Sequence, residues 1–175
     1  SKENIIISGL SSNSKEVKKN FIFFAIKGNK ENGEKFISDA IKRGASVVVC
    51  SKNSKIVNKN IFLIKTNNIR NFLSNIASRF YHTKPKNIIA VTGTNGKTSV
   101  ADIFYQILRI NKISAGTIGT LGVKYNDKTI KTSLTTPDTV SLHKNLQSLK
   151  RNKIENIMIE ASSHGLEQNR LNHVN

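Results

Sequence analysis

Short apolar runs alternate with helix-like segments along the first half of the chain. Strand-like runs rich in β-branched and aromatic residues occur at 5–7, 21–26, 45–50 and 61–64. Two other segments, 34–43 and 69–82, repeat their apolar residues at helical spacing instead. This alternation predicts a small α/β unit.

A second pattern of strands and helices begins after the polar, proline-containing segment 83–86. It predicts strands at 87–91, 113–118 and 156–160, helices at 97–109 and 140–151, and a hairpin that turns at Asn126-Asp127. We therefore place a boundary here, with domains at 1–84 and 85–175. Strands separated by helices imply parallel pairing in a doubly wound α/β sheet, which binds ligands at the carboxyl ends of its strands.

The charge of the chain is its most unusual bulk property. Its 175 residues include 28 Lys and Arg against 11 Asp and Glu, for a formal charge of +17. That value alone suggests a polyanionic partner. The basic residues are mostly scattered lysines, aromatic residues make up 6% of the chain, and tryptophan is absent. This distribution favours a solvated basic surface over a nucleic-acid interface, although the charge could attract phosphorylated small molecules.

Two further features bear on the cellular setting. Cys50 is the single cysteine and cannot form an internal disulfide, so we interpret it as a small buried hydrophobe in a reducing compartment. The apolar stretch near the N-terminus is too short for a signal peptide, and no segment has the length of a membrane span. We expect a soluble, cytoplasmic protein without a membrane partner.

The segment from Ile88 to Ser99 carries the strongest chemical signal. It reads IIAVTGTNGKTS, an apolar strand that leads through a glycine-containing loop into Gly-Lys-Thr at a helix start. The N–H groups of such a loop attract phosphate, Lys97 can reach the β- and γ-phosphates, and the Thr98 hydroxyl can hold Mg²⁺. Val91 stands where the general P-loop pattern has glycine. The order of strand, loop and helix still favours a nucleotide site over a turn that binds nothing.

Glu160 ends the apolar strand predicted at 156–160, so it should stand at the same sheet edge as the loop. An acid there can complete the coordination of a metal ion that bridges nucleotide phosphates. The alternative is an ordinary surface or helix-capping glutamate. The apolar character of the strand favours the metal-ligand role.

Three segments carry a family resemblance: TGTNGKT at 92–98, TTPD at 135–138 and EASSHGLEQNR at 160–170. Together they resemble the Mur ligases of peptidoglycan synthesis. The last segment is specific to the MurE type, the UDP-N-acetylmuramoyl-L-alanyl-D-glutamate:amino-acid ligases, whereas the first is shared with sister ligases and folylpolyglutamate synthetases. Segments 13–17, 23–28 and 40–45 follow the order of the family's UDP-binding domain, so the resemblance spans the whole chain.

The resemblance implies a role for each part of the chain. The N-terminal domain would bind the uridine diphosphate of the substrate, and the rest would be the first part of a truncated P-loop domain that binds ATP. The ATP loop would comprise Gly93, Thr94, Asn95, Gly96, Lys97, Thr98 and Ser99. Thr98 and Glu160 would hold Mg²⁺, and Lys97 and Glu160 would be the catalytic residues.

The implied substrate contacts lie in both domains. Those with the uridine diphosphate would come from Ser12, Ser14, Asn29, Lys30 and Glu31. Those with the muramoyl peptide would come from Thr135, Thr136, Ser162, Gln168 and Arg170. The family's Asp-Ser-Arg is Asn13-Ser14-Lys15 here, so no role is carried over to Asn13 or Lys15. Asp138 is also expected to cap the helix that follows it.

The implied reaction uses ATP to phosphorylate the D-glutamyl carboxylate, and the amine of an amino acid then attacks the acyl phosphate. It would serve peptidoglycan synthesis, and through it cell-wall biogenesis, cell shape and cell division. Mur ligases also have a carbamylated lysine, an Asp-His-containing segment and a C-terminal domain that binds the amino acid, and none is found in these 175 residues. We therefore expect an N-terminal fragment that does not catalyse ligation by itself.

Two other functions fit part of the sequence. A stand-alone basic P-loop module that engages nucleic acid would account for the charge and the loop. A folylpolyglutamate-type ligase would share the loop but would leave the segment 162–170 and the N-terminal domain unexplained.

The four histidines indicate no hydrolase and no metal centre. His164 follows two serines, but adjacency does not make a nucleophile-base pair, and no Gly-x-Ser-x-Gly is present. We interpret His164 as structural or substrate-orienting. His82, His143 and His173 lack metal-ligand spacing, and we expect them at a solvated surface.

Overall fold

The chain divides into two compact units, Ser1–Leu73 and Ser74–Asn175. The computed structural model describes residues 5–28, 31–58 and 60–174. The division falls within helix α2 (Ile69–Phe80), before the boundary predicted at 84 and 85. Ser74 donates its hydroxyl proton to the Asn172 carbonyl, which ties the later part of α2 to the second unit. A functional boundary at 84 and 85 stays a prediction.

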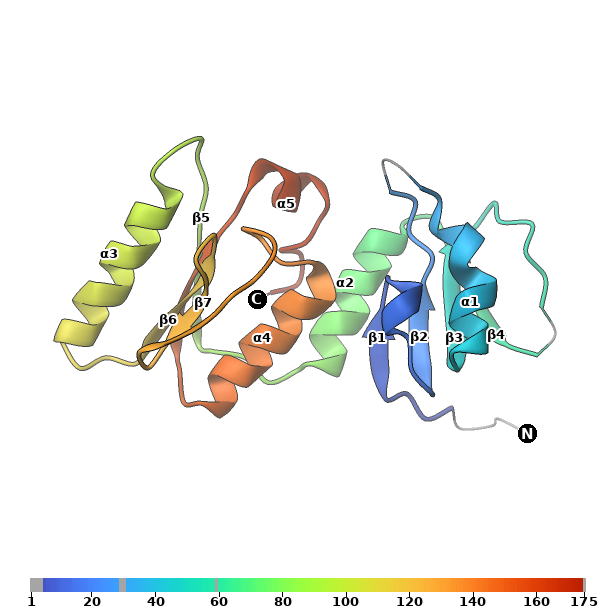
Figure 1. Cartoon of the computed structure of the whole chain (residues 1–175), viewed down its shortest axis with the longest axis horizontal. Coiled ribbons are helices and arrows are strands. Elements are labelled where there is room, and N and C mark those ends of the chain that lie inside the picture. Colours follow the sequence, from blue (N-terminus) through green and yellow to red (C-terminus); the bar gives the residue numbers. More distant parts are fainter. Residues whose placement is uncertain (1–4, 29–30, 59, 175) are drawn as a thin grey trace. The chain divides into compact units, whose positions relative to one another are not determined.

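The first unit is a four-stranded parallel sheet with the strand order β1-β2-β3-β4 (Figure 1). Its strands are β1 (Gly9–Ser11), β2 (Phe21–Phe24), β3 (Ala45–Ser51) and β4 (Phe62–Thr66). The connections contain the 3-10 turns η1 (Ser14–Glu16) and η2 (Gly33–Phe36) and the helix α1 (Ile37–Lys42). Phe23, Ala40, Val48 and Cys50 belong to its core, so the burial predicted for the cysteine is confirmed.

Two predicted elements of this unit differ in the structure. The run 5–7 is not a strand, because β2 begins at Phe21, which pairs with Gly9, and residues 5–8 have no partner strand in the described part of the chain. The helix predicted at 34–43 begins as the 3-10 turn η2. The Asn32 side chain accepts a hydrogen bond from the Glu34 N–H and closes this turn before α1 starts.

The second unit is a five-stranded sheet with the order β5-β9-β6-β7-β8. Its parallel strands are β5 (Asn87–Val91), β9 (Asn156–Glu160) and β6 (Ala115–Gly119), and its antiparallel strands are β7 (Gly122–Tyr125) and β8 (Lys128–Ile130). The sheet is mixed because Thr120 and Leu121 form a connection that is too short for a parallel crossover. The predicted hairpin is confirmed, with φ angles of 45° at Asn126 and 60° at Asp127.

Helices cover both faces of this second sheet (Figure 1). Helix α3 (Lys97–Ile110) packs against β5, β6 and β9 with Ala101 and Tyr105 buried. Helix α4 (Thr139–Arg151) lies on the other face, where Leu142, Leu146 and Leu149 join the core. Asp138 caps α4 as predicted, since its carboxylate accepts hydrogen bonds from the N–H groups of Val140 and Ser141. In the described part of the chain, no helix has the length and apolar character needed to cross a membrane.

The prediction of a solvated His143 is wrong. This side chain is 1% exposed on the inner side of α4, next to Leu142. Burial lowers its pKa to about 4, although the backbone of Asn172 favours the protonated form by hydrogen bonding. Nε2 finds no hydrogen-bond partner among the described residues. The prediction failed because the sequence of this helix does not show whether the side of the helix that carries His143 packs against another element. His82 and His173 are exposed, as expected.

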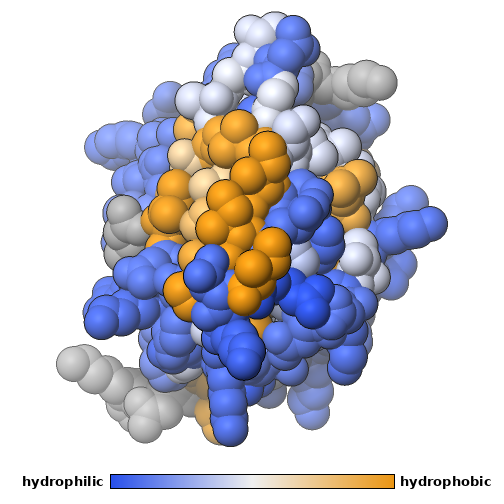
Figure 2. Space-filling model, turned by 90° about the vertical axis from the view of Figure 1, so that its left-hand side faces the viewer, coloured by the Kyte–Doolittle hydropathy of each residue, from blue (hydrophilic) through white to orange (hydrophobic). Residues whose placement is uncertain are grey.

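The outward side of α3 is apolar. Exposed Val100, Ile103, Ile107 and Ile110 follow one another at helical spacing, and Ile89 of β5 is also exposed. Figure 2 shows a continuous apolar patch on the side of the molecule where α3 lies. We call these five residues the α3 apolar surface. Strand β5 stands at the edge of the described sheet, although its sequence NIIAV is apolar on both faces, as in strands that are covered on both sides.

Candidate functional site

The loop between β5 and α3 has the backbone that a phosphate site requires. Gly93 and Gly96 have φ angles of 142° and 82°, which side chains rarely allow. Gly96 is the N-cap of α3 and supplies no side-chain cap to the first turn. The N-terminal end of α3 therefore keeps its positive partial charge directed at the loop. The structure thus builds the predicted strand, loop and helix in order, at the carboxyl end of β5.

Lys97 lies against this loop. Its Nζ donates a hydrogen bond to the Gly93 carbonyl at 2.6 Å, and the Thr94 carbonyl is 3.5 Å away. The ammonium group is thus held over the turn whose N–H groups would face a phosphate. This position allows Lys97 to add a full positive charge to the partial charge of the helix end.

Glu160 stands across from the loop at the end of β9, and its side chain is 2% exposed. The carboxylate accepts hydrogen bonds from the Thr98 hydroxyl at 2.8 Å, the Thr120 N–H at 3.1 Å and the Thr120 hydroxyl at 3.0 Å. Among the described residues, it forms no ion pair. A buried carboxylate held only by neutral donors is costly to desolvate, and a divalent cation would offset that cost.

Glycine at 119 makes room for this carboxylate. A Cβ at that position would lie 1.9 Å from the nearer Glu160 oxygen, so any other residue would displace the carboxylate. Thr98 and Glu160 offer hard oxygen donors of the kind Mg²⁺ prefers, and nucleotide phosphates and water usually complete such a shell. The described residues contain no cluster of three or more His, Cys, Asp or Glu that would bind a metal without such help. The donor set therefore fits Mg²⁺ held together with a nucleotide.

The segment that carries Thr135 and Thr136 is tied to the end of β9. The Thr135 and Thr120 hydroxyls are 3.1 Å apart. Thr136 is 1% exposed, and its hydroxyl donates to the Glu160 carbonyl at 2.7 Å and accepts from the Ser162 N–H at 2.9 Å. Thr135 thus faces the carboxylate site, whereas the Thr136 hydroxyl is engaged within the fold.

The residues after β9 fold back onto the same segment. The Ser162 side chain caps the short helix α5 (Ser163–Glu167), which no apolar period had marked in the sequence. Arg170 donates to the Thr136 carbonyl at 2.6 Å and to the Gln168 side chain at 2.8 Å. Ser162, Gln168 and Arg170 are therefore brought together with Thr135 and Thr136 beside Glu160, where their substrate roles stay a prediction.

His164 is exposed and lies 3.4 Å from Glu167 through Nδ1. Because both side chains are more than two-thirds exposed, at 73% and 76%, this contact contributes little. No element of the described fold packs over the ring. Its structural or substrate-orienting role stays a prediction.

The residues predicted to contact the uridine diphosphate lie in the first unit. Ser14 is buried. Its side chain forms a hydrogen bond with the Asp39 carboxylate, and this bond is the main reason why the pKa of Asp39 lies below its usual range. Ser12 and Glu31 are exposed. Asn29 and Lys30 lie outside the described residues. A common uridine diphosphate site for these five residues stays a prediction.

A cleft of about 400 Å³ opens at the carboxyl ends of β2, β3 and β4. The polar residues that line it include Lys27, Asn32, Ser51, Asn53 and Thr66. Ser12, Ser14 and Glu31 are not part of this lining. None of the cleft residues carried a prediction, although the carboxyl ends of parallel strands are where an α/β sheet binds its ligands.

Thr120 was also absent from the sequence-based predictions. It follows Gly119 at the carboxyl end of β6, and β6 pairs in parallel with β9, which ends at Glu160. Gly-Thr at a strand end is the signal that could have marked it, since the carboxyl ends of neighbouring parallel strands meet.

Comparison with known protein families matches both parts of the chain. The model of the Mur ligase family catalytic domain matches residues 6–81, and the model of the Mur ligase middle domain matches residues 91–175. A UDP-N-acetylmuramoyl-L-alanyl-D-glutamate--2,6-diaminopimelate ligase of Rhizobium meliloti is 44% identical over 171 residues, which is 97% of this chain and 35% of that protein.

Solved structures agree in fold. The structure of a UDP-N-acetylmuramoyl-L-alanyl-D-glutamate--2,6-diaminopimelate ligase matches with a TM-score of 0.79 and 30% identity, over 95% of this chain and 34% of that one. A MurF ligase of Thermotoga maritima in complex with ADP matches with a TM-score of 0.58 and 22% identity, over 92% of this chain and 33% of that one, which supports the fold alone. The chain thus spans about a third of the length of the relatives it matches.

Proposed function

Because the chain belongs to the Mur ligase family, we propose that it forms the substrate-binding and nucleotide-binding part of an ATP-dependent ligase. The ligase would join an amino acid to UDP-N-acetylmuramoyl-L-alanyl-D-glutamate in the assembly of peptidoglycan. The name of the similar Rhizobium meliloti protein suggests 2,6-diaminopimelate as that amino acid. The use of ATP and of a UDP-linked precursor fits the cytoplasm.

One observation carries this proposal: a glycine-bounded loop, a lysine and a buried carboxylate meet at the carboxyl edge of one sheet. Lys97 lies on the loop, and Thr98 joins α3 to Glu160 through a 2.8 Å hydrogen bond. This is the set of groups that phosphoryl transfer requires: N–H donors and a cation for the phosphates, with an oxygen pair for Mg²⁺. A turn without a ligand would have no need to bury a carboxylate beside the loop.

In the first chemical step, the substrate carboxylate would attack the terminal phosphate of ATP and ADP would leave. Different residues of the site would have different roles in this step. The loop N–H groups and Lys97 would hold the phosphates and stabilise the charge that builds on them. Thr98 and Glu160 would hold Mg²⁺, which supplies further charge neutralisation when bound. Thr135 contacts Thr120 and Arg170 contacts the Thr136 carbonyl, and from these positions they would orient a carboxylated peptide.

The second step needs groups that this chain has not been found to contain. The amine must meet the acyl phosphate in line, and such positioning is worth about 7–11 kcal/mol of barrier. We therefore propose that the 175 residues bind substrate and nucleotide but release no phosphate in response to an amino acid. Phosphate release that required both ATP and an amino acid would contradict this part of the proposal.

Binding measurements on the 175-residue chain test the function directly. Calorimetric titrations with Mg²⁺ and ADP, with UDP-N-acetylmuramoyl-L-alanyl-D-glutamate, and with short DNA and RNA at physiological salt should give binding to the first two ligands. Submicromolar and steeply salt-dependent binding of nucleic acid alone would instead support a basic nucleic-acid module.

Lys97→Ala should weaken ADP binding by about tenfold or more, because loss of a charged hydrogen bond costs about 1.5–3 kcal/mol. The affinity for the UDP-linked substrate should stay unchanged. Lys128→Ala, at an exposed position on β8, is the matched control for a change in charge. Equal loss of both ligands in Lys97→Ala would contradict two separate sites.

A further inference from the structure

We propose that Thr120 is a positioning residue that orients the Glu160 carboxylate for the divalent cation and links it to Thr135. This inference rests on the proposed nucleotide site and adds a residue to it. Thr120 stands on the short connection between β6 and β7, opposite the phosphate loop across the end of β9.

Thr120 contacts both oxygens of the carboxylate. Its backbone N–H donates to Oε1 at 3.1 Å, and its hydroxyl lies 3.0 Å from Oε2. Two contacts from one residue to two oxygens fix the plane of the carboxylate as well as its position. Gly119 adds to this, because its missing Cβ is what allows the carboxylate to lie so close to the end of β6.

The proton count gives this network a direction. An ionised carboxylate only accepts hydrogen bonds, and a hydroxyl has one proton to donate. The Thr120 hydroxyl must therefore donate to Glu160, and the Thr135 hydroxyl, 3.1 Å away, must donate to Thr120. The result is a chain of hydrogen bonds from Thr135 through Thr120 to Glu160, in which each bond strengthens the next.

The Thr98 hydroxyl also donates to Oε2, but its proposed role differs from that of Thr120. In the proposed function, the Thr98 oxygen is itself a ligand of the cation. Thr120 instead holds the carboxylate itself: its hydroxyl shares Oε2 with Thr98, and its N–H binds Oε1, which Thr98 does not contact. Groups that orient a metal ligand in this way typically change metal affinity by about 10- to 100-fold when they are removed.

The test uses the 175-residue chain with Mn²⁺ as the probe ion. The affinity for ADP is measured by calorimetry with and without Mn²⁺, and the Mn²⁺ affinity of the ADP complex by electron paramagnetic resonance. The variants are Thr120→Val, Thr120→Ser and, as a control at an exposed position on β8, Thr129→Val. Because Thr120 is exposed on a connection, Thr120→Val should fold, and its circular dichroism and thermal midpoint are recorded.

We expect Thr120→Val to weaken Mn²⁺ binding by about tenfold or more while metal-free ADP binding is unchanged. Thr120→Ser should restore the affinity, and Thr129→Val should match the unmodified chain. The inference is overturned if Thr120→Val keeps its Mn²⁺ affinity, or if it loses metal-free ADP binding to the same extent, which would mean that Thr120 only holds the fold. An unmodified chain that bound no ADP with or without metal would give a different pattern and would overturn the nucleotide site together with this inference.

Discussion

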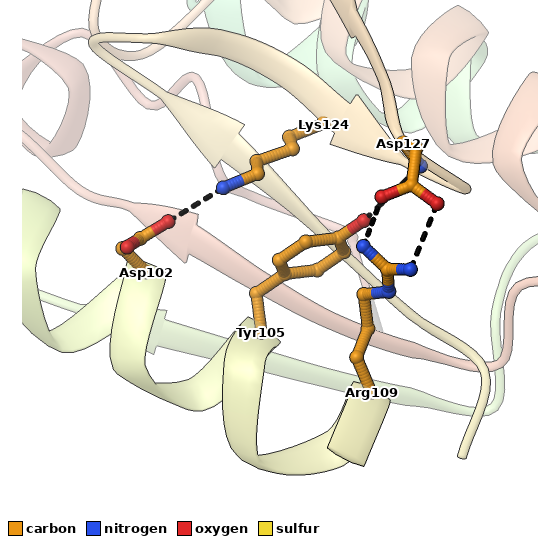
Figure 3. Close-up of polar contacts among 5 residues, drawn as sticks. All are labelled: Asp102, Tyr105, Arg109, Lys124 and Asp127. Atoms are coloured by element: carbon orange, nitrogen blue, oxygen red, sulfur yellow. Dashed lines mark hydrogen bonds and ion pairs between the residues drawn. The ribbon is translucent and has the colours of Figure 1, made fainter. Parts of the chain in front are cut away.

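Arg109 on α3 holds Asp127, in the turn between β7 and β8, through both of its terminal guanidinium nitrogens (Figure 3). Beside this pair, the Asp127 N–H donates to the Tyr105 hydroxyl at 3.4 Å, and Lys124 donates to Asp102 at 2.6 Å. The Lys124 ammonium also lies 4.7 Å from the centre of the Tyr105 ring. The five residues thus tie the hairpin to the helix that begins at the phosphate loop.

The ring of Tyr105 should dominate this contact. The side chain is 1% exposed, so Tyr105→Ala removes a buried aromatic group and should lower the free energy of unfolding by about 3–5 kcal/mol. Tyr105→Phe keeps the ring and loses one long hydrogen bond, so its effect should stay below about 1 kcal/mol. Urea denaturation followed by circular dichroism measures both. Similar losses in the two variants would mean that the hydroxyl, and not the ring, carries the contact.

Gly119 should tolerate no side chain. Gly119→Ala would place a Cβ 1.9 Å from the Glu160 carboxylate and force it out of reach of Thr98 and Thr120. We expect metal-dependent ADP binding to fall by about tenfold or more. Gly28→Ala is a useful control, because a Cβ at that position would lie 3.4 Å from the Glu31 carbonyl oxygen, an ordinary contact distance. Unchanged metal dependence in Gly119→Ala would show that the carboxylate is free to move.

Stability should depend on pH through His143. Burial lowers its pKa from 6.5 to about 4, and the positive charges of Lys84 and His173 act in the same direction. Between these two values the unfolded chain binds the proton that the folded chain excludes, so this contribution is fully present above pH 6.5 and is lost as the pH falls toward 4. The shift corresponds to about 3 kcal/mol.

Denaturation between pH 4 and pH 7 measures this dependence. His143→Gln cannot titrate and should show a flatter profile whatever its absolute stability. His82→Gln is the matched control at an exposed position. If the profiles of His143→Gln and the unmodified chain are parallel, His143 does not cause the pH dependence.

The α3 apolar surface should make the isolated chain self-associate. Ile103 and Ile107 are 56% and 53% exposed, and a continuous apolar patch of this kind is uncommon on soluble monomers (Figure 2). Replacing both by lysine should shift the chain toward the monomer in size-exclusion chromatography with light scattering. Ile130→Lys on β8, also 53% exposed, should not. Unchanged association in the double variant would exclude this surface as its cause.

Local patterns predicted the second unit well. The bounds of β5 and β9 agree with the predicted 87–91 and 156–160, and α3 begins at Lys97 as expected. These elements have strong apolar periods and clear ends, so their bounds can be predicted without knowing which elements they pack against. The loop and Glu160 were predicted to meet for the same reason, because both follow strands whose direction was evident.

What the sequence left open depends on contacts between distant segments. The pairing of β6 with β9 brings Thr120 to Glu160, yet these two residues are far apart in the chain. His143 is buried by packing that its own helix does not reveal. The run 5–7 has strand-like residues but no partner strand. In each case, the deciding information lies in the tertiary structure and not in the local period.

The strand order also bears on how the protein is made. Within the described residues, β5 pairs only with β9, which lies between β5 and β6 in the sheet although it is the last of its strands in the sequence. During synthesis, the phosphate loop therefore leaves the ribosome long before β9, the strand that supports it. The position of β9 between β5 and β6 must stay empty while the hairpin and α4 are made. Such long-range parallel pairing is slow and leaves apolar strands unpaired in the meantime. The nascent chain should acquire its nucleotide site only after residue 160 has left the exit tunnel, which makes this stretch of translation the period in which β5 most needs protection by chaperones.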